Sequence, residues 1–200
     1  MRIARSFAVV LGTLAVATTA AAGPPLLCHP FNTGGARSLP WGSGQGWNQP
    51  LPGYDRSHLI ADTQALLAAE VPVFARMETL RRAAIYATAD RALAGQLLAQ
   101  LQARAGSGEP MFLFDAGYLA ETYKQADWLF KVFNPAAKVD GYGLIEKALA
   151  LRSDPEMEFA AALIAFDPRS GRHQAHLDKA RDGAPKDTLL AANLASHFVK

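Results

Sequence analysis

The sequence predicts an all-α protein, and three observations support this fold class. From Asp55 onward, apolar residues recur at intervals of three and four, the period of an amphipathic helix. Prolines and glycines fall between these periodic stretches, where helices begin and end. No segment shows the apolar–polar alternation of a half-buried strand. We therefore expect one domain, a right-handed stack or bundle of helical hairpins with about seven helices, preceded by an irregular arm.

The first 22 residues have the organisation of a secretory signal peptide. Arg2 and Arg5 form a positive start, residues 7–17 are apolar, and Ala20–Ala22 offer small side chains for cleavage. The apolar run is shorter than the roughly 20 residues that a membrane-spanning helix needs. We expect an exported protein, periplasmic or extracellular, with no membrane span after cleavage. An uncleaved N-terminal anchor is the alternative.

Signal cleavage would leave a domain of balanced charge. The whole chain has 20 Lys and Arg against 18 Asp and Glu, and residues 1–22 contain two of the arginines and no acid. The remainder therefore carries 18 charges of each sign. A neutral domain lacks the positive potential that attracts nucleic acid or an anionic membrane, so we expect neither as a partner.

Residues 23–53 differ in composition from the rest and form the predicted arm. Their prolines and glycines disfavour a helix, because proline lacks an amide donor and glycine loses much backbone entropy. Two of the three tryptophans, Trp41 and Trp47, nevertheless lie here. Rings of that size favour burial. We therefore expect the arm to lie across the helical domain, residues 54–200.

Six stretches of residues 54–200 show the helical period, and two less regular ones follow. They span residues 59–71, 72–88, 90–105, 110–134, 142–151, 155–167, 170–182 and 187–198. Pro72 and Asn134–Pro135 end the first and fourth, because the residue before a proline avoids helical geometry. Ser153 and Glu156 fit a capping box at the start of the sixth. Glu78 and Arg82, four residues apart, predict a surface ion pair.

The last part of the chain resembles a tetratricopeptide repeat over about 30 residues. Positions of that pattern are occupied by Met157, Ala160, Ala161, Ile164, Leu177, Ala180 and Pro185. His173 replaces the usual small alanine, Ala160 replaces leucine, and the earlier hairpins do not follow the pattern. The resemblance implies a stack of helical hairpins, which in that family binds other proteins.

The single cysteine, Cys28, is followed by His29 and admits several interpretations. A lipid anchor requires a small residue before the cysteine, but Leu27 stands there. Covalent c-type haem needs two cysteines before the histidine. A reactive thiol needs a positioned base, for which His29 or His58 is the candidate. The favoured interpretation is a buried cysteine that anchors the arm, since free cysteine is among the most buried residue types.

Three other groups of polar residues could form sites. His173 and His176 could share a helix face and bind a metal, but a third ligand is missing, so a solvated polar face is favoured. Asp115, Glu121 and Asp127 could do acid–base work or bind a di-metal centre. Solvated pairing is favoured, because Glu121 lies three residues before Lys124 and Asp127 lies four before Lys131. The helix at residues 72–88 has a polar flank, which we expect to be solvated or to bind an anionic ligand. Its members are Arg76, Arg81, Arg82 and Tyr86.

No nucleotide, zinc or catalytic-serine motif is present, and we expect no cofactor and no metal. The sequence therefore favours a non-enzymatic module that binds a protein partner in the cell envelope. The residues we expect at its binding surface are Cys28, His29, Trp41, Trp47, Arg81, Arg82 and Tyr86. Two alternatives remain: an enzyme or small-ligand binder with Cys28, His29 and His58 between arm and helices, and a purely structural envelope component.

Overall fold

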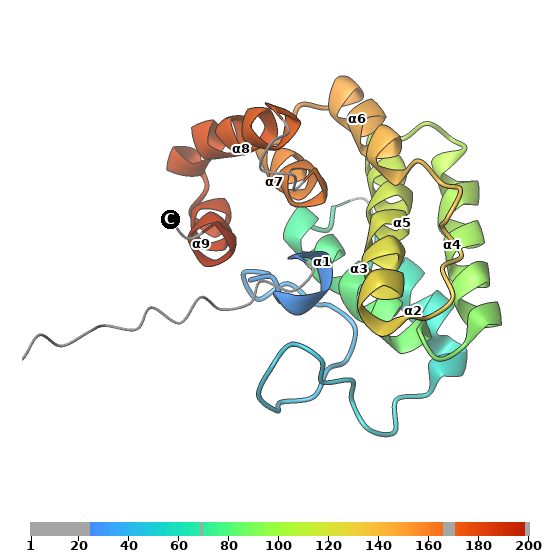
Figure 1. Cartoon of the computed structure of the whole chain (residues 1–200). Helices are drawn as coiled ribbons and strands as arrows, with labels where there is room; N and C mark the ends of the chain where they lie inside the picture. The colour runs from blue at the N-terminus through green and yellow to red at the C-terminus, as the bar shows by residue number, and fades with distance from the viewer. Residues whose placement is uncertain (1–24, 69, 166–170, 199–200) are drawn as a thin grey trace, which may run out of the picture.

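The computed structural model describes residues 25–68, 70–165 and 171–198, and over these ranges it confirms the all-α fold (Figure 1). These ranges contain nine α-helices, two short 3-10 helices and no strand. The elements are α1 (Pro25–Cys28), η1 (Arg56–His58), α2 (Leu59–Ala65), α3 (Val73–Ala87), α4 (Arg91–Ala105), α5 (Pro110–Phe130), α6 (Gly141–Leu151), α7 (Pro155–Ile164), α8 (Gly171–Gly183), η2 (Ala184–Lys186) and α9 (Thr188–His197). None of these helices is long and apolar enough to cross a membrane. The predicted signal peptide and the predicted helix end at 167 lie outside the described residues.

Most helix boundaries follow the predicted ones, with three corrections. The four-residue helix α1 lies in the arm, where no helix was expected. Helix α2 ends at Ala65, well before Pro72. Helix α5 ends at Phe130 and not at Asn134, because Lys131 adopts the left-handed conformation (φ 55°) and its N–H bonds back to the carbonyl of Asp127.

The predicted capping box at α7 is wrong. The carboxylate of Asp154, not the hydroxyl of Ser153, accepts the N–H groups of Glu156 and Met157 at 3.0 and 3.3 Å. Glu156 does not turn back to the cap; its carboxylate accepts the N–H of Val73 at 3.1 Å. The first turn of α7 is therefore tied to the first turn of α3.

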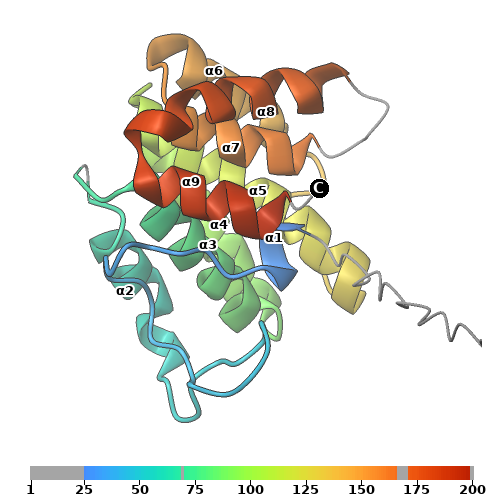
Figure 2. The ribbon, with the colours of Figure 1, turned by 90° about the vertical axis from the view of Figure 1, so that its left-hand side faces the viewer.

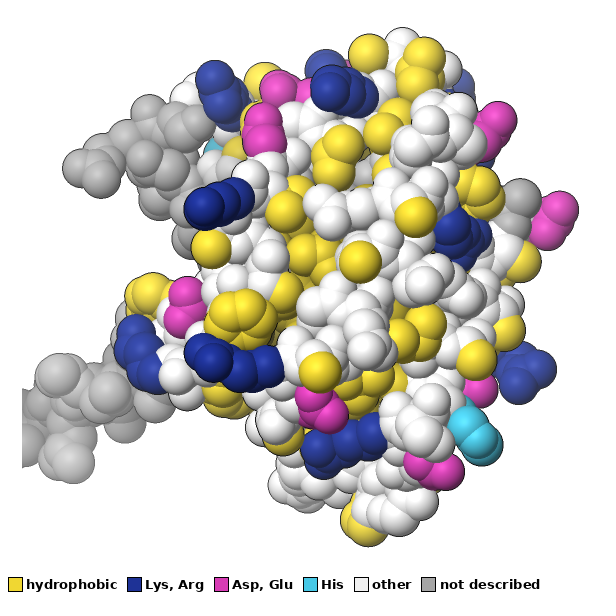
Figure 3. All heavy atoms as spheres, turned by 90° about the vertical axis from the view of Figure 1, so that its right-hand side faces the viewer, with side chains coloured by type: hydrophobic (Ala, Val, Ile, Leu, Met, Phe, Trp, Pro, Cys, Tyr) yellow, Lys and Arg dark blue, Asp and Glu magenta, His cyan; other side chains and the backbone are white. Residues whose placement is uncertain are grey.

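Helix α5 forms the centre of one half of the molecule, where it packs against α3, α4 and α6. Helices α7 and α8 pack on each other, and α9 lies beside α7 and α8 (Figures 1 and 2). Figure 2 shows the arm running from α1 in front of α3 and below α9. On the opposite side of the molecule, hydrophobic side chains are interspersed with charged and other side chains (Figure 3).

The arm supplies part of the hydrophobic core. Leu26, Leu27, Phe31 and Leu39 are all buried, the first two and Leu39 completely. The ring of Phe31 packs edge-on against Phe159 of α7. The arm therefore lies across the helices as the tryptophans predicted, and its first half is as deeply packed as the helices themselves.

Candidate functional site

Helix α3 carries charged residues in the interior. All its residues except Arg82 are buried, and the side chains of Glu78 and Arg81 are both 0% exposed. The predicted Glu78–Arg82 ion pair is present at 2.6 Å, but its carboxylate is buried, not at the surface. The expectation of a solvated polar flank is likewise wrong for Arg76, Arg81 and Tyr86, all of which are buried.

The Glu78 carboxylate is the centre of this group. Its two oxygens accept the Nε and Nη2 groups of Arg81, both at 2.8 Å, in a bidentate pair. They also accept Nε of Arg82 at 2.6 Å and the backbone N–H of Phe31 at 3.1 Å. Burial alone would raise the pKa of Glu78, but the two guanidinium groups and the Phe31 N–H outweigh it and hold that pKa below its usual value.

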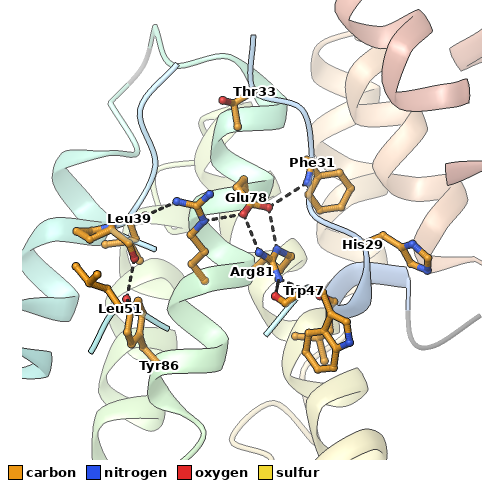
Figure 4. A network of polar contacts seen from close by, with 12 residues as sticks. His29, Phe31, Thr33, Leu39, Trp47, Leu51, Glu78, Arg81 and Tyr86 are labelled. Carbon is orange, nitrogen blue, oxygen red and sulfur yellow. Dashed lines mark hydrogen bonds and ion pairs between the residues drawn. The ribbon is translucent and has the colours of Figure 1, made fainter. Parts of the chain in front are cut away.

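The guanidinium donors left over from Glu78 bind the arm. Nη1 of Arg81 donates to the carbonyls of Leu27 at 3.0 Å and Trp47 at 2.9 Å, and Nη1 of Arg82 donates to the carbonyl of Leu39 (Figure 4). These three carbonyls lie in different parts of the arm. A single turn of α3 therefore fixes the arm at three points.

One turn further along α3, Tyr86 adds further contacts between this helix and the arm, including one with Trp41. The Tyr86 hydroxyl donates to the carbonyl of Pro40 at 2.7 Å and accepts the N–H of Leu51 at 2.9 Å. The Trp41 ring packs edge-on against Tyr86, and the guanidinium carbons of Arg81 and Arg82 lie 5.1 and 5.5 Å from its centroid. Of the predicted site residues, the structure thus brings together Trp41, Arg81, Arg82 and Tyr86.

Two further helices hold the start of the arm. The Gln125 side chain of α5 accepts the N–H of Leu26 at 2.8 Å. The Asn193 amide of α9 bonds both the N–H and the carbonyl of Asn32, at 2.9 and 3.0 Å. Backbone groups at the start of the arm are therefore paired with side chains, as burial requires.

The second half of the arm is held less tightly. We call residues 42–49 the flap. The N–H of Gly42 donates to the carbonyl of Gln49 at 2.8 Å beside an isolated bridge between Trp41 and Pro50, and Gly46 turns the chain with φ 95°. Most flap residues are exposed. Apart from its Arg81 contact, the flap rests on the body through the half-buried ring of Trp47, whose centroid is 5.8 Å from that of Phe130.

The three residues of the predicted alternative site do not assemble into a reactive centre. Cys28 is half-buried and packs against a small apolar cluster with Leu27, Ile85 and Ala126. Burial raises the pKa of its thiol, and the charge of Arg81 opposes this only in part. His29 packs near His197, with ring centroids 5.8 Å apart, and burial lowers its pKa. His58 is exposed in η1.

The acidic residues of α5 have different environments. Asp115 is buried and forms an ion pair of 2.6 Å with Arg76, so the expectation that it is solvated is wrong. Glu121 pairs with Lys124 at 2.7 Å, as predicted. Burial raises the pKa of Asp115 to about 6 despite the opposing charge of Arg76.

The expectation of a solvated face around His173 and His176 is also wrong. His176 is buried, with Nδ1 bonded to the Glu158 carboxylate and Nε2 2.7 Å from the hydroxyl of Tyr142. Nδ1 of His173 lies 2.8 Å from the carbonyl of Ala162. Among the described residues, no cluster of three or more His, Cys, Asp or Glu side chains is arranged to hold a metal ion.

Comparison with known proteins identifies no relative: no family model, no curated protein and no solved structure matches the chain. Helices α7 and α8 pack on each other, as in a helical hairpin, but the tetratricopeptide resemblance remains a resemblance of pattern. The arrangement itself indicates one kind of chemistry. Guanidinium, carboxylate and phenol groups on α3 bind the backbone of an extended chain, and aromatic rings pack beside them.

Proposed function

We propose that this chain is an exported, non-enzymatic module that binds an extended segment of a partner protein in the cell envelope. The supporting observation is that α3 already binds an extended chain, its own arm, mostly through backbone atoms. Arg81, Arg82 and Tyr86 donate hydrogen bonds to main-chain carbonyls of the arm. Every peptide offers such carbonyls, so these contacts place few demands on the sequence that is bound.

The flap is the part of the arm that a partner would replace. The first half of the arm contributes Leu26, Leu27, Phe31 and Leu39 to the core, and releasing it would expose all four side chains. The flap contributes one half-buried aromatic ring and one carbonyl contact to Arg81. Its release therefore costs much less free energy than release of the whole arm.

The environment of Trp47 defines what the partner must supply. Its ring rests on Phe130, beside an apolar cluster that includes Ile85 and Ala126. Its carbonyl accepts a hydrogen bond from Arg81 at 2.9 Å. A suitable partner segment is therefore extended and not strongly charged. It contains one large aromatic residue, flanked by glycine or other small residues.

A labelled peptide with the sequence of residues 42–49 tests the proposal by fluorescence anisotropy. In the wild type the flap competes with the peptide. The apparent Kd is then the intrinsic Kd divided by the fraction of molecules in which the flap is released. In Trp47→Ala the flap loses its anchor while Arg81 and Phe130 remain, so we expect a Kd at least about tenfold lower than in the wild type.

Trp128→Ala is the matched control, because Trp128 lies near the same end of α5 as Phe130 but is 65% exposed and outside the flap. It should leave the Kd unchanged. Equal affinities of wild type and Trp47→Ala, or no binding by either, would count against the proposal.

The proposal that the protein is exported is based on residues 1–22. They contain two arginines, an apolar run and small residues, as a signal peptide does. The intact mass of the protein isolated from its own cells tests it. We expect a chain that begins at Gly23. A full-length chain in the cytoplasmic fraction would contradict export without bearing on the peptide experiment.

A further inference from the structure

Two aromatic side chains near the end of α5 are exposed to solvent. Trp128 is 65% exposed and Phe133 is 46% exposed. They are two of the four large hydrophobic side chains that are exposed in the described part of the chain, and they lie only five positions apart. Lys131, between them, is exposed as well. We call Trp128, Lys131 and Phe133 the α5 tip. Exposed aromatic surface concentrated in one short segment indicates an interaction surface.

The α5 tip is held in place by the apolar residues between its members. Leu129, Phe130 and Val132 are half-buried and pack against the small apolar cluster that also holds Cys28. The helix ends at Phe130, and Lys131 then adopts the left-handed conformation. Because the intervening side chains occupy the inner side of the segment, the two exposed rings cannot turn inward without displacing them. Their exposure therefore follows from the packing of the segment.

Each exposed ring of the tip has a cation beside it. Nζ of Lys131 lies 5.8 Å from the centroid of the Trp128 ring, and the guanidinium carbon of Arg91 lies 4.4 Å from that of Phe133. Among the described residues neither cation forms an ion pair, so the pairing expected between Lys131 and Asp127 is absent. Both positive charges therefore remain available to an anionic group outside the chain.

Aromatic rings with cations beside them are typical of protein surfaces that lie at the membrane–water interface. Tryptophan is enriched there because its amphipathic ring sits at the level of the lipid headgroups. Lysine and arginine place their apolar stems along the same surface and keep their charges among the lipid phosphates. The α5 tip offers both kinds of group within one short stretch of surface.

The chain enters the described structure beside the tip. Helix α1 packs on α5, and the N–H of Leu26 donates to the side chain of Gln125, about one helical turn before Trp128. Figures 1 and 2 show α1 beside the last turns of α5. The apolar residues 7–17 of the predicted signal peptide precede α1. The eight residues from there to Pro25 can span at most ~28 Å. While residues 7–17 are in a membrane, the tip is therefore close to its surface.

We propose that the α5 tip is a membrane-contact surface, at which Trp128 and Phe133 enter the headgroup region of a bilayer that contains anionic phospholipids. Lys131 and Arg91 bind the lipid phosphates beside the two rings. The balanced charge of residues 23–200 gives no long-range attraction to an anionic membrane. The contact is instead local, and the start of the chain brings it within reach. The tip lies outside the flap, so this inference does not depend on the proposed peptide binding.

Vesicles with brominated phospholipids test the proposal, because bromine quenches the fluorescence of a tryptophan only when the ring enters the bilayer. The full chain is mixed with vesicles of phosphatidylethanolamine and phosphatidylglycerol. The readout is local, so binding of residues 1–22 to the same vesicles does not obscure it. Trp128→Phe keeps an aromatic ring but removes the reporter. We expect most of the quenching to be lost in this variant, since Trp41 and Trp47 are half-buried in the arm. Equal quenching in both proteins would overturn the proposal.

Leu151→Ala is the matched control, because Leu151 is 64% exposed at the end of α6 and is not part of the tip. It should leave the quenching unchanged. Lys131→Gln should reduce the quenched fraction of Trp128 by up to about fivefold, the factor that one lysine contributes at an anionic surface. Acrylamide should reach Trp128 before vesicles are added. If it does not, residues 7–17 or a second copy of the chain cover the tip, and the proposal is overturned.

Discussion

The backbone N–H of Phe31 donates a hydrogen bond of 3.1 Å to the carboxylate of Glu78, a residue 47 positions further along the chain. Both residues are buried, and the same carboxylate binds Arg81 and Arg82. One carboxylate thus pairs with two guanidinium groups and with the backbone of the arm. The Glu78 carboxylate therefore contacts the arm directly and also holds the two arginines that bind arm carbonyls.

Glu78→Gln should therefore destabilise the protein strongly. The substitution keeps the shape of the side chain but leaves the buried Arg81 without its counter-charge. Removing one partner of a buried ion pair costs about 3–5 kcal/mol. Urea unfolding followed by tryptophan fluorescence measures the change in the free energy of unfolding.

Asp178→Asn is the control for the loss of one negative charge, because Asp178 is 59% exposed and lies 3.8 Å from Arg181. A surface pair of this kind contributes at most about 1 kcal/mol, so the control should unfold much as the wild type does. If Glu78→Gln loses no more stability than Asp178→Asn, the carboxylate does not hold the arm.

Glu156 should make the protein less stable as the pH rises towards neutrality. Burial, followed by the charges of Asp187 and Asp154, raises its pKa from 4.5 to about 7. A carboxyl with a raised folded-state pKa binds its proton more tightly in the folded chain than in the unfolded chain. Its stabilising contribution is therefore complete below pH 4.5 and is lost as the pH rises through 7.

Glu156→Gln tests this assignment. The amide can still accept the N–H of Val73 and donate to Asp187, but it does not ionise. We expect the decline in stability around pH 7 to disappear and Glu156→Gln to be more stable than the wild type at pH 8. The decline that Asp115 causes as the pH rises towards 6 should remain. An unchanged pH profile would show that folding does not raise the pKa of Glu156.

The helices could be predicted from the sequence because their signals are local. The apolar period sets which residues are helical, and single residues such as Gly106 and Pro110 mark the ends. The end of α5 could not be predicted in this way, because Lys131 adopts a conformation that its residue type rarely takes. The cap of α7 was misassigned since both Ser153 and Asp154 are residues that cap helices.

The candidate site was harder to predict, because charged residues were assumed to be exposed. Trp41, Arg81, Arg82 and Tyr86 were among the predicted binding residues, but Glu78 was placed at the surface. One signal was present: the stretch METLRRAAIY has apolar residues on every face of the helix, so its charges had to be buried and paired with one another. Nothing local links Tyr142 to His176, because their contact arises only from the packing of α6, α7 and α8.

Cys28 should react slowly with alkylating reagents in the folded protein. Its thiol is half-buried, and burial raises its pKa, so the thiolate fraction at neutral pH is below that of a free cysteine. We expect carbamidomethylation by iodoacetamide to be slower than that of glutathione at the same pH, and to speed up in urea. Intact mass spectrometry follows the reaction. A rate in the folded protein above that of glutathione would restore the nucleophile interpretation.

The contact between α5 and α6 depends on two glycines that face each other. A Cβ atom on Gly117 would lie 2.5 Å from the carbonyl oxygen of Gly141, and one on Gly141 would lie 2.6 Å from the carbonyl oxygen of Gly117. Neither backbone can move without shifting its helix. Gly117→Ala should therefore destabilise the protein by about 1–3 kcal/mol, the usual cost of overpacking, although alanine favours helix formation.

Gly95→Ala is the matched control, because Gly95 lies within α4 and a Cβ atom there meets nothing within 4 Å. This substitution should stabilise the protein by about 0.4–1 kcal/mol, since alanine restricts the unfolded chain and favours the helix. Thermal unfolding monitored by circular dichroism compares the two variants. Both substitutions raise helix propensity, but only Gly117→Ala disturbs helix packing. The opposite signs of the two changes in stability therefore separate the two effects. If Gly117→Ala also stabilises the protein, α5 and α6 do not approach as closely as described, and the position of Tyr142 at the start of α6 would have to be revised.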